Sequence, residues 1–195
     1  MNSIMNFEKT RAWIKSRLSE ERYLHSLGTE QTAKELAQRF GVDEEKAAFA
    51  GLIHDNAKNI SYEDMLRIIK ENNFDMEEDV KTNQKILHAY LGSYLAKKDL
   101  NINEPEILDA IKYHTTGRVN MNTLEKIIFL ADKIEANTRD IDFRCEVLNI
   151  LNESNSLDKA VLHCVERTIK SLLDRKLHIN SITIDVWNYY LNRVH

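Results

Sequence analysis

Histidine and aspartate side chains recur in a fixed order along this chain, and their chemistry is the most informative feature of the sequence. The order is histidine, histidine–aspartate, histidine, histidine, aspartate, formed by His25, His54, Asp55, His88, His114 and Asp132. Each lies beside apolar residues in a stretch of helical periodicity, so each is expected to face the interior. Buried aspartate is rare unless it is paired or binds a metal, and imidazole with carboxylate suits iron, manganese, zinc or cobalt. The set predicts a metal centre.

Taken singly, these residues have simpler interpretations. An inward histidine is more often a hydrogen-bonded core residue than a ligand, and a buried aspartate often pairs with lysine or arginine. The prediction therefore rests on the whole ordered set. His54 and Asp55 are adjacent, so in a regular helix they would point about 100° apart. Both can serve one centre only at a helix end, and the NAKN segment that follows is compatible with such an end.

Helices must position these residues, because the apolar spacing is helical almost throughout. The sequence holds only five glycines and one proline, which favours helices joined by short loops over a many-stranded sheet. Helices are expected over residues 6–17, 20–40, 44–55, 61–72, 83–98, 105–114, 122–135, 146–151 and 156–176, with a last one from about residue 183. The fold class is predicted to be all-α, a single bundle of about eight to ten helices. The 195 residues would form one domain, with the metal-binding core at about residues 20–140 and C-terminal helices at about 144–192 packing on it.

Composition excludes several functional classes. A formal net charge of −4 and no basic stripe argue against a nucleic-acid binder. Cys145 and Cys164 form no CxxC pair and are expected to be small buried hydrophobes in a reducing compartment. The N-terminal segment has no apolar signal region and no stretch of about 18 apolar residues occurs, so no membrane association is expected and the cytoplasm is the expected location. The aromatic set at Trp187, Tyr189 and Tyr190 predicts either a docking face for the last helix or a homodimer contact.

Longer motifs around these residues carry a family resemblance. They read RYLHSLGTEQTAKELA at His25, GLIHDNAK at His54, ILHAYLGSYLA at His88, AIKYHTTGR at His114 and LEKIIFLADKIE at Asp132. This pattern resembles the HD superfamily and, more closely, the bacterial YqeK-type HD proteins, which are symmetrical diadenosine tetraphosphate hydrolases. The resemblance spans about residues 22–192. The histidine–aspartate dipeptide alone is a loose signal, whereas YHTTGR with LEKIIFLADKIE at a short spacing is specific.

The resemblance implies a role for each residue of the ordered set. His25, His54, Asp55 and Asp132 would hold one metal, while Asp55, His88 and His114 would hold a second, with Asp55 bridging. The family centre is commonly described as di-iron, and manganese, cobalt or zinc would also suit the ligands. Two cations about 3.5–4 Å apart would share a water and lower its pKa for attack on an inner phosphorus. The implied reaction yields two molecules of ADP from a small nucleotide substrate.

Residues near this set are suited to contacting phosphate: Lys58, Thr115, Thr116, Gly117, Arg118 and Arg139. Lys58 is also expected to assist Asp55 in catalysis, and the hydroxyls and the glycine main chain would donate hydrogen bonds to phosphate oxygens. Solvated charges and a plain helix C-terminal turn remain the simpler alternatives. In the family, proline follows the glutamate that matches Glu135, and a phosphate-contacting arginine comes soon after. Here Ala136 replaces the proline, and Arg139 is displaced by about a residue.

Two other functions remain open at this point. One alternative is a general HD phosphohydrolase that acts on nucleoside mono- or triphosphates. The metal ligands expected for that enzyme are the same as for a diadenosine tetraphosphate hydrolase, so they cannot distinguish the two. Alternatively the chain would be a nucleotide-sensing HD module without turnover. Every position of the ordered set is filled here, which disfavours a sensor.

Overall fold

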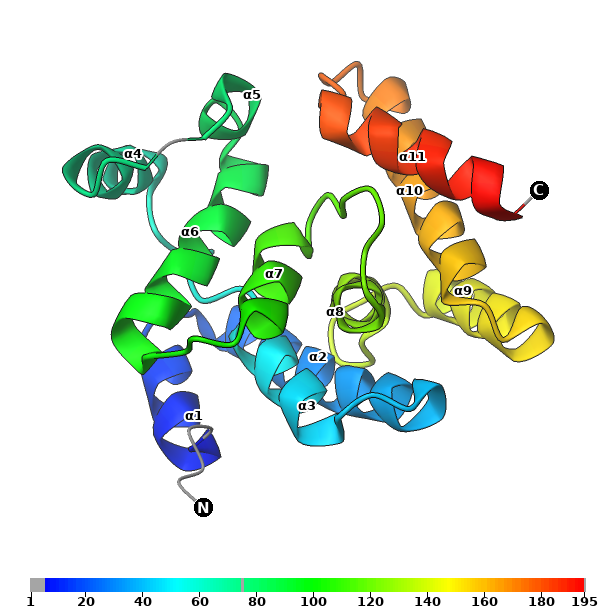
Figure 1. Cartoon of the computed structure of the whole chain (residues 1–195), viewed down its shortest axis with the longest axis horizontal. Helices are drawn as coiled ribbons and strands as arrows, with labels where there is room; N and C mark the ends of the chain where they lie inside the picture. Colours follow the sequence, from blue (N-terminus) through cyan, green and yellow to red (C-terminus); the bar gives the residue numbers. More distant parts are fainter. Residues whose placement is uncertain (1–5, 75, 195) are drawn as a thin grey trace.

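The computed structural model describes residues 6–74 and 76–194, and over them the chain forms eleven α helices and no β strand (Figure 1). The predicted all-α class is confirmed. The helices are α1 (Phe7–Lys15), α2 (Glu20–Phe40), α3 (Glu44–Ile53), α4 (Tyr62–Glu71), α5 (Glu78–Lys81), α6 (Gln84–Leu100), α7 (Pro105–Tyr113), α8 (Thr123–Ile134), α9 (Ile141–Ser154), α10 (Leu157–Asp174) and α11 (Ser181–Val194). None of these described helices is both long and apolar enough to cross a membrane.

Helix α8 is the centre of the molecule, and Figure 1 shows it nearly end-on. Helices α2, α3, α7, α9 and α10 all pack against it. Its side chains Ile127, Ile128, Leu130 and Ala131 are fully buried, as its continuous apolar sequence requires. Asp132 lies in the last turn of the same helix, so the central helix of the core also carries a charged residue into the interior.

Side-chain caps explain why several helices begin where they do. Ser19, Asp43 and Asn122 each accept a hydrogen bond from the backbone N–H three residues later, at the starts of α2, α3 and α8. Gly41 ends α2 with φ of 69°, a left-handed conformation that suits glycine. These caps fix the lengths of the helices that bring the histidines together.

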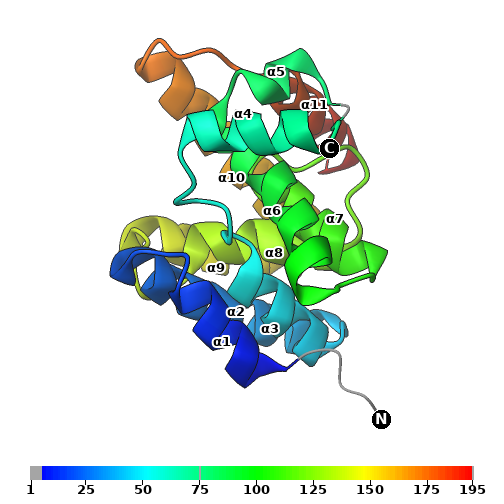
Figure 2. The same ribbon diagram turned by 90° about the vertical axis from the view of Figure 1, so that its left-hand side faces the viewer.

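A second, smaller core lies between α4, α5 and α6, and includes the buried residues Met65, Val80, Leu87 and Leu91. Figure 2 shows α4 and α5 on the side of the molecule opposite α1, α2 and α3. Helix α5, with only four residues, is an addition to the predicted set. By packing against one face of α6, this core holds the helix that presents His88 on another face.

The C-terminal helices differ from expectation in two respects and agree with it in a third. Helix α9 begins after the cap residue Asp140 and is longer than the predicted residues 146–151. Cys145 on α9 is exposed, whereas Cys164 is buried as predicted. Tyr190 on α11 is fully buried, and Trp187 packs against the main core. The aromatic set thus docks α11 within the chain, as the first of the two interpretations predicted, and the homodimer stays a prediction.

Candidate metal centre

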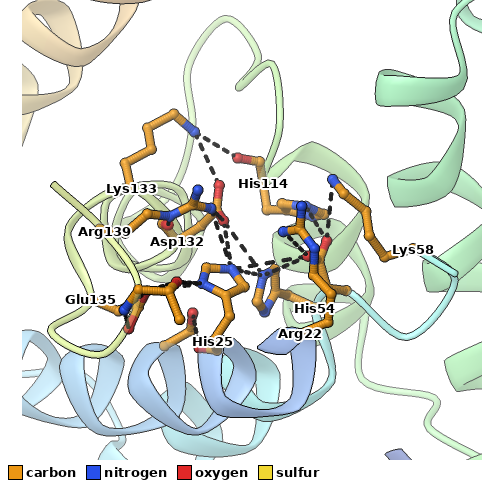
Figure 3. A network of polar contacts seen from close by, with 12 residues as sticks. Arg22, His25, His54, Lys58, His114, Asp132, Lys133, Glu135 and Arg139 are labelled. Carbon is orange, nitrogen blue, oxygen red and sulfur yellow. Dashed lines mark hydrogen bonds and ion pairs between the residues drawn. The ribbon is translucent and has the colours of Figure 1, made fainter. Parts of the chain in front are cut away.

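Five structural elements bring the ordered histidine and aspartate residues to one place. The contributions come from α2 (His25), the end of α3 (His54 and Asp55), α6 (His88), the end of α7 (His114) and α8 (Asp132). None of these residues is more than 9% exposed. Figure 3 shows the side chains of His25, His54, His114 and Asp132 converging from different helices.

His54 and Asp55 reach the same centre because α3 ends at Ile53. The chain turns at once, with the Lys58 N–H donating to the Asp55 carbonyl at 2.8 Å. The Asn56 side chain secures this turn by donating to the Gly92 carbonyl of α6 at 2.9 Å. A Cβ atom at position 92 would lie 3.3 Å from that amide, so a glycine permits the close approach of the turn to α6. The expectation that this pair lies at a helix end is confirmed.

The first half of the centre joins His25, His54 and Asp132. Nε2 of His25 lies 3.2 Å from Nε2 of His54 and 3.0 Å from Oδ1 of Asp132. Nε2 of His54 lies 3.6 Å from the same carboxylate oxygen. Oδ2 of Asp55 is 3.9 Å from Nε2 of His25 and 3.8 Å from Nε2 of His54. Four potential ligand groups therefore face one small volume.

The second half joins His88 and His114 to the other oxygen of Asp55. The two Nε2 atoms are 3.2 Å apart, and they lie 3.0 Å and 3.4 Å from Oδ1 of Asp55. The Asp55 carboxylate thus lies between two histidine pairs and turns one oxygen toward each. This arrangement is that of a carboxylate able to bridge two cations.

Two observations support a fit between these groups and metal ions. Both Asp55 oxygens are buried and lack a well-formed hydrogen bond within the described part of the chain. Burial alone would raise the pKa of Asp55, but the neighbouring imidazoles and the Lys58 ammonium hold its pKa well below the ordinary value. An ionised, buried carboxylate surrounded by imidazole nitrogens is costly without a cation. Nitrogen and oxygen ligands without thiolate suit iron, manganese, cobalt or zinc.

The outer nitrogens of two imidazole rings are held by the backbone. Nδ1 of His54 donates to the Gly51 carbonyl at 2.7 Å, and Nδ1 of His114 donates to the Ile111 carbonyl at 2.7 Å. With the proton on Nδ1, each Nε2 lone pair points into the centre. Burial lowers the pKa of His114 to about 4, so this ring is neutral near neutral pH and able to act as a ligand.

Glu135 plays the corresponding part for His25. Its Oε1 lies 3.1 Å from Nδ1 of His25, while the backbone N–H groups of Asn137 and Thr138 and the Thr138 hydroxyl also donate to its carboxylate. These hydrogen bonds outweigh the opposing effect of burial and lower the pKa of Glu135 to about 2. The carboxylate therefore orients His25 without itself reaching the centre.

Four cationic side chains surround the cluster (Figure 3). Arg22 lies 3.5 Å from Oδ2 of Asp55, and Lys58 lies 3.1 Å from Nε2 of His88. Lys133 lies 3.5 Å from Oδ2 of Asp132, and Arg139 lies 2.7 Å from its Oδ1. Sequence reasoning identified Lys58 and Arg139 but missed the other two. Arg22 precedes His25 by one helical turn and Lys133 adjoins Asp132, and this spacing is the only signal that marks them.

A cavity of about 550 Å³ opens beside the cluster. His114 and Asp132 of the cluster line it, together with Lys58, Thr115 and Arg139. Lysine and arginine side chains outnumber carboxylates among the residues that line this cavity, so it is suited to an anionic ligand. Of the residues expected to contact phosphate, the structure brings these three to the cavity.

The structure does not bring the other three expected phosphate contacts to that cavity. The Thr116 hydroxyl donates to the Gly117 carbonyl, and the Gly117 N–H donates to the Tyr113 carbonyl at 2.8 Å. Arg118 instead pairs with buried Glu125 through two hydrogen bonds of 2.7 Å and 2.6 Å. The polar groups of this segment are used within the fold, which favours a structural role, and the expectation that Thr116, Gly117 and Arg118 contact phosphate stays a prediction.

Comparison with known proteins agrees with this geometry. The family model described as HD domain matches residues 22–137. The symmetrical bis(5'-nucleosyl)-tetraphosphatase of Bacillus subtilis is 35% identical over 96% of this chain and 99% of that protein. The protein of that name from Staphylococcus aureus is 35% identical over 95% of each chain. A crystal structure from Clostridium acetobutylicum, described as a predicted HD superfamily hydrolase involved in NAD metabolism, superposes with a TM-score of 0.90 at 37% identity, covering 97% of this chain and 98% of that one.

Proposed function

Because this chain belongs to the HD domain family, and within it to the symmetrical bis(5'-nucleosyl)-tetraphosphatases, we propose that it hydrolyses diadenosine tetraphosphate to two molecules of ADP. The relatives match it over nearly their whole length, so the proposal concerns the whole chain. The structural observation that carries it is the buried Asp55 carboxylate between two histidine pairs.

Two divalent metal ions are part of this proposal. His25, His54 and Asp132 would hold one with Oδ2 of Asp55, while His88 and His114 would hold the other with Oδ1. The support is that His25 and His54 face Oδ2 of Asp55, with Asp132 beside both histidines, while His88 and His114 face Oδ1. Bound at these positions, the ions would supply Lewis-acid stabilisation of the phosphates and a water of lowered pKa.

The chain's own residues supply the positive charge that a polyphosphate requires. Arg22 and Lys58 lie on one side of the cluster, beside Asp55, and Lys133 and Arg139 lie on the other side, beside Asp132 (Figure 3). In this proposal their side chains bind the non-bridging oxygens of the inner phosphates and neutralise charge that grows as the central anhydride breaks. Water oxygen joins one inner phosphorus, and the bridging oxygen departs with the other half of the substrate.

Iron is proposed as the native metal among those that the ligand set accepts. The set of four imidazoles and two carboxylates, with no thiolate, also suits manganese and cobalt. Anaerobic purification followed by elemental analysis would test this part. Two iron atoms per chain would support it, and a full complement of zinc or manganese in protein from unsupplemented cells would overturn it.

Product analysis tests the reaction itself. Purified protein would be incubated with diadenosine tetraphosphate and ferrous iron, manganese or cobalt, and the nucleotides separated by ion exchange. ADP as the sole product, lost on chelation, is the expected result. AMP with ATP would indicate asymmetrical cleavage, and released phosphate would indicate the more general phosphohydrolase. Binding without turnover under every metal would leave the sensing module as the better description.

A further inference from the structure

Three cavities follow one another along the molecule, and the cluster lies beside the middle one. A cavity of about 250 Å³ shares Arg22, Lys58 and Lys85 with the central cavity of about 550 Å³. On the other side, a cavity of about 700 Å³ shares Arg167, Ser171 and Arg175 with it. A ligand longer than the central cavity therefore has space in both directions from the cluster.

The shared residues on the larger side form one row along α10. Arg167, Ser171 and Arg175 are spaced four residues apart, so they lie on the same face of this helix and its C-terminal cap. All three line both cavities and are exposed. This α10 row is therefore the boundary that a ligand would cross on leaving the cluster in this direction.

The Arg167 side chain is positioned by an aromatic ring, and no carboxylate of the described residues forms a close ion pair with it. Its guanidinium lies over the ring of Phe143, 4.1 Å from the centroid. Its nearest carboxylates, those of Asp140 and Glu146, are 3.7 Å and 3.8 Å away, beyond ordinary hydrogen-bond distance. Arg175 has no ion pair with any other described residue. Both guanidinium groups are thus available to an anionic ligand.

The outer cavity has a different character from the central one. Glu146, Glu166 and Asp174 line it together with His163, so carboxylates balance its cations. A balanced lining attracts a phosphate chain less than the central cavity does, whereas ribose hydroxyls would donate to the carboxylates and a base would stack on guanidinium or imidazole. Going outward from the cluster, a ligand meets the cationic central cavity first and the mixed polar outer cavity next. This order matches a phosphate chain followed by a nucleoside.

We infer that the α10 row binds the second nucleoside diphosphate of a dinucleoside polyphosphate, the half that lies away from the metal centre. Arg167 and Arg175 contact its phosphates, and the outer cavity receives its nucleoside. The inference rests on the proposed function and adds to it the residues that distinguish a dinucleotide from a mononucleotide. Substitution of the α10 row would remove the higher affinity that a dinucleoside polyphosphate has relative to ADP.

Calorimetric titration of the manganese-loaded protein tests this. The ligands are a methylene-bridged, non-hydrolysable diadenosine tetraphosphate and ADP, and the variant is Arg167→Ala with Arg175→Ala. We expect the affinity for the long analogue to fall by at least about 30-fold, since two charge-assisted hydrogen bonds are lost. The affinity for ADP is expected to stay within about twofold, because the cluster alone accommodates it. Lys159→Ala removes an exposed cation of the same helix away from both cavities, and should change neither affinity.

Several results would overturn the inference. Unchanged affinity for the long analogue, or an equal loss for both ligands, would show that the row does not recognise the second half. If Arg175 serves only the C-terminus of α10, the variant would melt at a lower temperature and keep both affinities. In each of these cases wild-type protein still hydrolyses diadenosine tetraphosphate. If wild-type protein neither binds nor cleaves it, the proposed function fails and the inference fails with it.

Discussion

Glu135 and His25 are joined by a hydrogen bond of 3.1 Å between Oε1 and Nδ1, on the side of the imidazole that faces away from the other ligands. They are 110 residues apart in sequence. The contact fixes the rotation of the His25 ring and places the proton on Nδ1, so Nε2 faces the cluster. Glu135 is itself held by Asn137 and Thr138, which makes the loop after α8 a support for the centre.

Glu135→Gln is expected to weaken metal binding without removing a ligand. The amide keeps the shape of the side chain but loses the charge that increases the basicity of His25. Losses of roughly 10- to 100-fold in metal affinity are typical of such changes. Competition with a chromophoric chelator would measure the affinity, with Glu153→Gln on the exposed face of α9 as the control. Equal affinities in both variants would contradict this role for Glu135.

Asp55→Asn should abolish metal binding and hydrolysis together while the helices remain. The carboxamide has nearly the same size but cannot offer an anionic oxygen to each half of the centre. Because residues outside the ligand set already cost about 10- to 100-fold, we expect a loss above roughly 100-fold in activity. Elemental analysis, circular dichroism and product formation would be compared with Asp185→Asn, an exposed aspartate on α11. A variant with full metal content and wild-type turnover would rule out Asp55 as the bridging ligand.

Arg118→Ala should affect stability more than catalysis. The substitution leaves Glu125, whose side chain is fully buried, without its bidentate partner. Breaking such a pair costs several kcal/mol, and because 36% of the Arg118 side chain is exposed we expect about 2 kcal/mol here. For a chain of this size that corresponds to a fall of roughly 5 °C in Tm.

Kinetics provide the second measurement for Arg118. KM for diadenosine tetraphosphate should stay within about twofold of wild type, because in this prediction Arg118 pairs with Glu125 and does not contact the substrate. Arg67→Ala removes an exposed ion pair on α4 and should change Tm by less than about 1 °C. A large rise in KM with an unchanged Tm would restore Arg118 to the phosphate contacts.

Asp158 makes the packing of α10 sensitive to acid. Burial would raise the pKa of its carboxyl, but hydrogen bonds from Lys126 of α8 and Arg193 of α11 lower it below the ordinary 3.8. A lowered pKa in the folded state contributes stability above the unfolded-state pKa, and this contribution is lost as the pH falls through the folded-state pKa. At neutral pH it amounts to about 1 kcal/mol or less.

Thermal unfolding as a function of pH measures this contribution. Below about pH 4, Tm of the wild-type protein should fall more steeply than Tm of Asp158→Asn, which has no carboxylate to protonate. Asp185→Asn again serves as the control, because Asp185 is exposed and has no ion pair within the described residues. Parallel pH profiles for wild type and Asp158→Asn would show that the pair with Lys126 and Arg193 contributes nothing measurable.

The sequence predicted most helices because their end signals are local. Helix α2 begins and ends at the predicted residues, since Ser19 caps one end and Gly41 has a left-handed φ at the other. Helix α5 was missed because a segment of four residues shows no periodicity. Helix α9 begins earlier than the predicted residue 146 because Asp140 caps it, accepting a hydrogen bond from the Phe143 N–H.

The cluster of histidines and aspartates could also be anticipated, whereas the contacts around it could not. The order of histidines and aspartates is visible in the sequence, and its convergence depends on helices that the sequence also indicates. The partner of Arg118 is not visible in this way, because whether it faces phosphate or Glu125 depends on how the loop before α8 turns back. For the same reason the support that Glu135 gives His25 could not be inferred.

The spread of the ligands along the chain has a consequence for biosynthesis. His25 and Asp132 meet across 107 residues, and α10, which covers one side of α8, follows later still. A growing polypeptide on the ribosome therefore exposes His25, His54 and Asp55 well before Asp132 is made. Domains mature as units during synthesis, and contacts between residues distant in sequence form late. We expect the full set of ligand side chains to be complete only late in synthesis, so the metal ions proposed for this centre would bind only then.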